Sequence, residues 1–318
     1  MGFIWNKIVR LVLVVLAVTA LTFLMVNLLP GDVADMIGGQ GASQEDVQTI
    51  RQDLGLDRNI LVRYVTWLGH LIQGDLGQSY LTQESVLRVI MTRLPVTVEL
   101  LVISQFFTLL LALPAGIFSA YRNGSFLDRL ISIGAFATLS IPNFVMALVG
   151  IYLFAIQLRW LPATGYTPLS YGFWANIRSF ILPALSITLI EWVVLMRVLR
   201  SDMITTLQQN YILMARAKGL PPWKVLVHHA LRPSSFTLVT VLGMQIGRLL
   251  GGAVIIETIF ALPGIGRLMV NAIYARDYMV VQGCIILITI GYVVINTIVD
   301  ILYNILDPRI RTEPSHAG

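Results

Sequence analysis

Long apolar runs alternate with shorter polar segments along this chain of 318 residues. A hydrocarbon core about 30 Å thick needs about 20 consecutive apolar residues per spanning helix, and we take runs near that length as candidate spans. They cover residues 11–29, 96–119, 130–156, 181–199, 236–259 and 283–306. The pattern therefore predicts an all-α polytopic membrane protein with six transmembrane helices.

The longest polar interruption, residues 30–95, has a pattern of its own. Ser43 followed by Asp46 is typical of a helix N-cap, and Gly55 is a suitable stop for that helix. The stretch 58–77 repeats apolar residues at mostly helical spacing before another glycine. We expect a small helical structure on the outer membrane surface, between spans one and two.

Composition and charge fit a membrane protein and give its orientation. The chain is 56% hydrophobic and 12% charged, with a net charge of +5. Because cytoplasmic loops collect Lys and Arg, the basic residues place both termini in the cytoplasm, including a short tail at 308–318. The residues on that side are Lys7, Arg10, Arg122, Arg129, Arg200, Arg216, Lys218, Lys224, Arg232, Arg309 and Arg311. The positive charge then reflects topology and contact with membrane lipid, and we expect no nucleic-acid partner.

The residues needed for catalysis are missing from the sequence. The lysines are Lys7, Lys218 and Lys224, and none follows a glycine, so there is no phosphate-binding loop of the G-x-x-x-x-G-K-[ST] type. The four histidines lack the spacing of a zinc site, and no nucleophile motif is present. We expect no enzymatic activity, no metal and no cofactor in this chain.

Two charges lie inside predicted spans, where each costs at least about 2.5 kcal/mol to insert. Glu191 and Arg248 lie at similar depths below the outer ends of spans four and five, with Gln245 one turn from Arg248. We expect the two charges to face each other or a shared aqueous cavity. They could line a translocation pathway, or they could be a structural ion pair that holds two helices together.

A basic segment at 201–233 separates spans four and five. The sequence predicts one helix over 201–218, a stop at Gly219 in a left-handed C-cap, and a second helix that starts near Pro222 and ends before Pro233. Such a rigid corner suits docking of its apolar side into a groove of a soluble partner. An amphipathic helix resting on anionic lipid has the same composition and stays open as an alternative.

The same segment resembles the cytoplasmic coupling loop of the permease subunits of ABC importers. The resemblance rests on "ARAKGL" at 215–220 and "HALRPS" at 229–234. Aligned on Gly219, the chain keeps Ala215 but has Leu213 where the family's acid stands and Met214 where its first alanine stands. These departures are typical of the permeases for dipeptides, oligopeptides, nickel and glutathione.

Blocks similar to that branch follow in order along nearly the whole chain. They are "LLPGD" at 28–32, "GDLGQSY" at 74–80, "RLPVTVEL" at 93–100, "LSIPNF" at 139–144, "GGAVIIETIFALPGIGRL" at 251–268, "ARDYMVVQG" at 275–283 and "DILYNILDPRIR" at 300–311. The resemblance implies a type I ABC importer permease fold, as a single transmembrane domain over 1–318 in the plasma (inner) membrane. It implies a second homologous permease, two ATPase subunits or a fused pair, which bind ATP and Mg, and an external solute-binding protein.

Within that family reading, peptides are the expected substrate, although the sequence does not separate peptide from nickel or glutathione. The residues expected to couple to the ATPases are Ala215, Arg216, Lys218, Gly219 and Trp223. The residues expected along the pathway are Glu191, Gln245 and Arg248. The alternative function is an ion-gradient-driven carrier or channel in which Glu191 is the coupling site.

Overall fold

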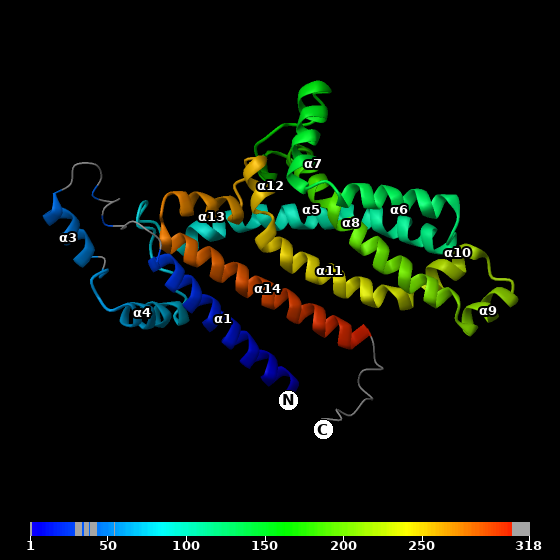
Figure 1. Cartoon of the computed structure of the whole chain (residues 1–318), viewed down its shortest axis with the longest axis horizontal. Coiled ribbons are helices and arrows are strands. Elements are labelled where there is room, and N and C mark those ends of the chain that lie inside the picture. Colours follow the sequence, from blue (N-terminus) through cyan, green and yellow to red (C-terminus); the bar gives the residue numbers. More distant parts are fainter. Residues whose placement is uncertain (1, 29–33, 35–37, 39–42, 54, 307–318) are drawn as a thin grey trace. The chain divides into compact units, whose positions relative to one another are not determined.

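Helices form nearly all the regular structure of the computed structural model, which describes residues 2–28, 34, 38, 43–53 and 55–306 (Figure 1). In those residues no strand occurs, and Gln78 and Ser85 form an isolated antiparallel bridge. The helices are α1 (Gly2–Leu28), α3 (Gln44–Asp53), α4 (Ile60–Ile72), α5 (Val86–Tyr121), α6 (Phe126–Leu139), α7 (Asn143–Gly150), η1 (Ile151–Gln157), η2 (Leu169–Tyr171), α8 (Phe173–Leu207), α9 (Asn210–Ala217), α10 (Pro222–Lys224), η3 (Val225–Leu231), α11 (Arg232–Gly252), α12 (Val254–Ile259), α13 (Ile265–Tyr274) and α14 (Tyr278–Leu306). The all-α prediction is confirmed, while the predicted tail at 308–318 lies outside the described residues.

The chain forms two compact units. The first unit consists of Met1–Thr97 and Pro263–Val293, and the second unit of Val98–Leu262 and Val294–Gly318. Helices α5 and α14 each contribute to both units. The expectation of a single permease domain stays a prediction.

The first unit contains both helices predicted in the segment between spans one and two. At the start of α3 the Asp46 amide donates to Ser43 Oγ (3.1 Å), and the Ser43 amide donates to Asp46 Oδ2 (3.2 Å). These reciprocal bonds form the predicted capping box. The predicted stop at Gly55 is also present, with a positive φ of 63°. Part of this segment, including residues 39–42, lies outside the described residues.

Helix α4 packs against α1 through aromatic side chains. The ring of Phe23 lies 5.4 Å from that of Tyr64 and 6.0 Å from that of Trp67, centroid to centroid. The hydroxyls of Thr19 and Tyr64 are hydrogen-bonded at 3.0 Å. This contact joins the first predicted span to the polar segment that follows it. Phe23 and Trp67 belong to one apolar core, which also contains residues from the start of α5, from α13 and from the start of α14.

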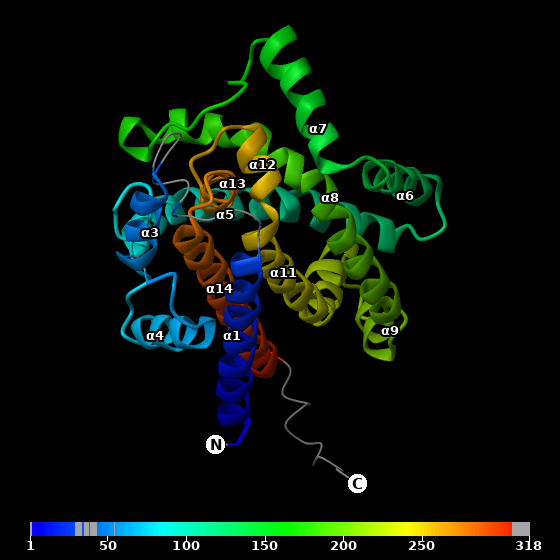
Figure 2. The same ribbon diagram turned by 60° about the vertical axis from the view of Figure 1, so that its left-hand side comes forward.

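Helix α8 is the centre of the second unit. It packs against α6, α7 and α11, and Figures 1 and 2 both show α11 beside it. Its side chains of Val193, Leu195, Leu199 and Met203 are fully buried. Helix α8 runs on to Leu207, inside the basic segment, and shares its apolar cluster with further residues of that segment.

Among the residues that the structure describes, three helices are long and apolar enough to cross a bilayer, namely α5, α8 and α14. Helices α6 and α7–η1 reach this standard only as a pair, which is bent by 96°. Within the described residues the apolar stretch of α1, Val12–Met25, is shorter. Helix α11 carries polar side chains along its length, as well as Arg248. The number of six spans therefore stays a prediction.

The sequence pattern predicted a continuous third span over 130–156. The structure instead breaks this stretch into separate helices. Helix α6 ends at Leu139, and α7 begins after Pro142, whose φ of −59° and ψ of 145° are extended. The residue before a proline is disfavoured in the helical region, and proline has no N–H to continue the ladder. The break therefore has a local cause in the sequence "LSIPNF".

The basic segment also differs from its prediction in two places. The helix expected over 201–218 is broken at Gln208 and Gln209, which separate α8 from α9. The second helix does not end before Pro233, because the π-helix η3 runs directly into α11, whose first turn contains that proline. Proline has no N–H to donate to the preceding turn, and the change from π-helical to α-helical bonding falls directly before it.

Candidate functional site

The corner of the basic segment is a Schellman motif at the end of α9. Gly219 has a φ of 76° and donates its N–H to the Arg216 carbonyl at 2.9 Å, while the Leu220 N–H donates to the Ala215 carbonyl at 3.3 Å. A Cβ at Gly219 would meet no atom within 4 Å. Glycine is thus favoured by the left-handed backbone and not by lack of space. The predicted C-cap is confirmed.

The basic segment has a buried face that belongs to the core of the second unit. Ile212 and Val225 are fully buried, and Ala215 is 7% exposed. They lie in one apolar cluster with Leu199 and Met203 of α8. This packing fixes the corner to α8, and Ala215 lies on the side of the corner that faces the core.

The opposite face of the segment is exposed, apolar and basic. Leu213, Met214 and Trp223 are each more than half exposed. The remaining predicted coupling residues, Arg216 and Lys218, are also exposed. A shallow hollow between them and the core is lined by Tyr121, Arg216, Leu220, Pro222, Val225 and Leu226. Such a surface offers both apolar contact and cations to a partner.

The predicted pathway residues are close together in the second unit. Nη2 of Arg248 lies 2.9 Å from each carboxylate oxygen of Glu191, and Gln245 donates through Nε2 to the Glu191 carbonyl at 3.1 Å. The Glu191 side chain is 8% exposed and the Arg248 side chain 64%. Arg248 makes no other hydrogen bond within the described residues. The Glu191 carboxylate is therefore buried and held, while most of the Arg248 side chain is exposed.

Helix α5 brings further polar side chains close to the depth of Glu191, and the sequence did not predict these residues as part of the site. Thr188 donates to the carbonyl of Ser104 at 3.1 Å, and Gly116 further along α5 approaches Leu199 further along α8, so the two helices run parallel here. Ser104 and Thr188 are therefore at the same depth. Thr108 lies one turn after Ser104, and Glu191 lies about one turn after Thr188, so Thr108 and Glu191 are also at the same depth. The side chains of Gln105 and Thr108 are buried without a hydrogen-bond partner in the described part of the chain.

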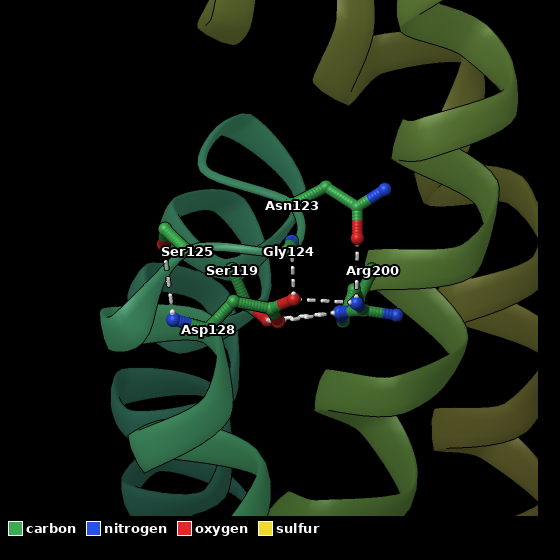
Figure 3. Close-up of polar contacts among 6 residues, drawn as sticks. All are labelled: Ser119, Asn123, Gly124, Ser125, Asp128 and Arg200. Atoms are coloured by element: carbon green, nitrogen blue, oxygen red, sulfur yellow. Dashed lines mark hydrogen bonds and ion pairs between the residues drawn. The ribbon is translucent and has the colours of Figure 1, made fainter.

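A second ion pair ties the turn after α5 to α8 (Figure 3). Arg200 donates through Nε to Asp128 Oδ1 at 2.9 Å and through Nη2 to Asp128 Oδ2 at 2.8 Å. It also donates to Ser119 Oγ at 2.9 Å and to Asn123 Oδ1 at 2.8 Å. Ser119 and the amide of Gly124 donate to the same carboxylate. We call Ser119, Asn123, Gly124, Asp128 and Arg200 the clasp.

The sequence predicts Arg200 and Asp128 only as cytoplasmic charges. One signal for the aspartate was available, because Ser125 followed by Asp128 has the spacing of a helix N-terminus, and Ser125 Oγ accepts from the Asp128 amide at 3.3 Å. The sequence offered no signal that pairs this helix start with Arg200, which is 72 residues away.

Two family models match the chain. The model described as "Binding-protein-dependent transport system inner membrane component" matches residues 112–312, and the corresponding N-terminal model matches residues 1–101. Together they cover both compact units.

Relatives and solved structures agree with the family models. A peptide transport system permease protein of Brucella abortus (strain 2308) is 42% identical over 308 residues, covering 97% of this chain and 98% of the relative. The di/tripeptide transport system permease protein DppB of Pseudomonas aeruginosa (strain UCBPP-PA14) is 36% identical, covering 98% and 99%. The MetNI methionine ABC transporter in an inward-facing conformation has a TM-score of 0.58 at 17% identity, covering 69% of this chain and 96% of that chain. At that identity the structural match concerns the fold alone.

Proposed function

The chain belongs to the family of binding-protein-dependent transport system inner membrane components, and on that premise we propose that it is the permease subunit through which an ATP-driven importer takes up peptides. The substrate rests on relatives that are named for peptide and di/tripeptide transport. As a permease of an ABC importer the chain is a membrane subunit and not the ATPase.

The proposed assembly contains a second homologous permease, two ATPase subunits or a fused pair, and an external solute-binding protein. ATP and Mg are bound by the ATPase subunits. The complex lies in the inner membrane with both termini of this chain in the cytoplasm. This topology rests on the distribution of Lys and Arg along the sequence.

The two-faced corner around Gly219 carries the mechanistic proposal. Its outer face, with Arg216, Lys218 and Trp223, docks on an ATPase subunit, while Ala215 holds the inner face in the core. Because the corner is capped and its inner face is packed against α8, movement of the ATPase displaces α8 instead of bending a loop. Helix α9 also contacts η3, which continues into α11, so the same push reaches the second helix of the Glu191–Arg248 pair.

We place the translocation pathway at the layer of Glu191, Gln245 and Arg248. The Arg248 side chain is 64% exposed on a helix that the sequence predicts to cross the membrane. Its charge needs water, substrate or another subunit as its neighbour, since lipid would leave the guanidinium unsolvated. The buried polar side chains of Gln105 and Thr108 at a similar depth support an aqueous path at this level.

Gly219 offers a direct test of the coupling step. We expect Gly219→Pro to abolish ATP-dependent peptide uptake in proteoliposomes, because proline cannot adopt a φ of 76° and cannot donate the 2.9 Å bond to Arg216. Gly219→Asn is the matched control, since asparagine tolerates the left-handed region. Assembly is followed by co-purification of the ATPase subunits. Full uptake by an assembled Gly219→Pro transporter would contradict the coupling role.

The alternative of an ion-gradient-driven carrier with Glu191 as coupling site has no support from the family. Both family models and the named relatives belong to transport systems that include further subunits. Uptake driven by a proton gradient, in vesicles that lack ATP, is the observation that would favour it.

A further inference from the structure

A groove of about 330 Å³ lies between α6 and α8 in the second unit, on a face of α8 that is turned away from Glu191. On α8 its lining residues recur three and four positions apart, from Val193 to Ser201, so they form one face of the helix. The two helices are antiparallel here, because Asp128 at the start of α6 meets Arg200, whereas Phe136 two turns later meets Arg197.

One end of this groove is polar and cationic. It is lined by Ser132 of α6 and by Arg197, Arg200 and Ser201 of α8. Arg197 is exposed, and its guanidinium lies 5.1 Å from the ring centroid of Phe136. Arg197 makes no ion pair or hydrogen bond among the residues that the structure describes. Nη1 of Arg200 is likewise unbonded there, because the clasp uses only Nε and Nη2.

The other end of the groove is apolar. It is lined by Ala135 and Phe136 of α6 and by Val193 and Met196 of α8. Along both helices these residues lie further from the clasp, and hence from the predicted cytoplasmic side, than Ser132 and Ser201. The groove therefore changes from polar to apolar in the direction that leads into the bilayer.

The charge balance at the polar end favours an anion. Arg197 and Arg200 contribute two positive charges, and Asp128 offsets one of them. The cation that has no ion-pair partner among the described residues belongs to Arg197. It lies on a helix that is apolar enough to span the membrane, where its charge must reach the headgroup region or another polar partner. Basic pockets between transmembrane helices on the cytoplasmic side are suited to anionic lipid headgroups.

We propose that the groove between α6 and α8 binds the headgroup of an anionic phospholipid from the cytoplasmic leaflet. The phosphate contacts Arg197, the free Nη1 of Arg200 and the hydroxyls of Ser132 and Ser201. The glycerol region and the upper acyl chain cover the apolar end, beside Phe136. A free phosphate would leave that end uncovered, so the polarity gradient favours the lipid. The inference goes beyond the proposed function, because it concerns neither peptide nor ATP.

A photoactivatable phosphatidylglycerol with the reactive group in its upper acyl chain tests the site. The assembled transporter is reconstituted in phosphatidylcholine bilayers containing a trace of this probe, irradiated and digested. We expect labelled peptides from α6 and α8, several-fold above the labelling by a matched phosphatidylcholine probe. Arg197→Gln should lower the phosphatidylglycerol signal to the phosphatidylcholine level. The matched control Arg129→Gln removes an exposed cation from α6 outside the groove and should leave the signal unchanged.

Three results would overturn the proposal. Equal labelling by the two probes removes the charge argument, and full labelling in Arg197→Gln removes the site. Loss of labelling on addition of inorganic phosphate shows that the groove binds a free anion instead of a lipid. If Arg197→Gln fails to assemble, Ser201→Leu serves as the second variant, since it narrows the polar end at an exposed position. Because labelling does not depend on uptake, the result is independent of the proposed peptide function.

Discussion

Arg200 holds Asp128 side-on, with Nε 2.9 Å from Oδ1 and Nη2 2.8 Å from Oδ2. The Asp128 side chain is 6% exposed and the Arg200 side chain 28%. Two parallel bonds of this kind fix the relative position of the two side chains as well as their distance. The pair thus joins the start of α6 to the last turns of α8, and Arg200 directly precedes the basic segment at 201–233.

The geometry of this clasp requires arginine. We expect Arg200→Lys to lower the stability of the transporter by roughly 1–3 kcal/mol, since an ammonium cannot replace the fork that also reaches Ser119 and Asn123. Thermal unfolding of the detergent-solubilised complex measures the change. Arg129→Lys, at an exposed position next to Asp128 on α6, is the control. An unchanged unfolding temperature for Arg200→Lys would show that the clasp contributes little.

Neutral variants separate the two roles that remain open for Glu191 and Arg248. Removing one partner of a buried ion pair costs roughly 3–5 kcal/mol, and we expect a smaller loss here because the Arg248 side chain is 64% exposed. The single variants Glu191→Gln and Arg248→Gln should therefore unfold at lower temperature. The double variant should recover much of the lost stability, because no unpaired charge is left.

Uptake by the double variant then decides the function of the pair. If the pair lines the pathway, the stable double variant should still transport peptide poorly. If it is only structural, transport should recover together with stability. Unchanged transport and assembly in both single variants would contradict the pathway role.

A close contact between α11 and α14 predicts a compensating pair of substitutions. A Cβ at Gly243 would lie 1.9 Å from Cγ2 of Val299, which is itself buried. Gly243→Ala should therefore destabilise the chain by about 1–3 kcal/mol through overpacking. Val299→Ala should relieve part of that cost, so the double variant is more stable than the sum of the single effects indicates. Strict additivity in a double-mutant cycle of thermal unfolding would show that the helices separate instead.

Acid should weaken the start of α3. The hydroxyl and then the amide of Ser43 donate to the Asp46 carboxylate and hold the pKa of Asp46 below its usual value. Since the folded-state pKa is the lower one, the stabilisation is fully present above the unfolded pKa of about 3.9 and is lost as the pH falls through the folded value. The measurement is the protection factor for amide exchange over residues 43–53 at a series of pH values, which compares the exchange rate with that of an unfolded chain at the same pH. Above pH 4, these amides should be less protected in Ser43→Ala than in the unchanged chain, and their protection should depend less on pH.

Local signals in the sequence were sufficient for much of the fold. The capping box at Ser43, the left-handed glycines at Gly55 and Gly219, and the all-helical pattern depend on residues within a few positions of one another. The meeting of Glu191 with Arg248 also followed from sequence, because two charges at equal depth in neighbouring apolar helices have few other partners. The break at Pro142 carried a local signal too, which the continuous apolar run outweighed.

The sequence by itself determined that this is a helical membrane chain with a capped basic corner and one charge pair within its apolar helices. Only the tertiary structure decided that Arg200 meets Asp128, that Thr108 lies buried at the depth of Glu191, and that α6 and α8 enclose a cationic groove. The reason is physical. Caps and turns depend on neighbouring residues, but which faces of two helices meet depends on their packing register, and a shift of one residue turns a side chain by about 100° to another face.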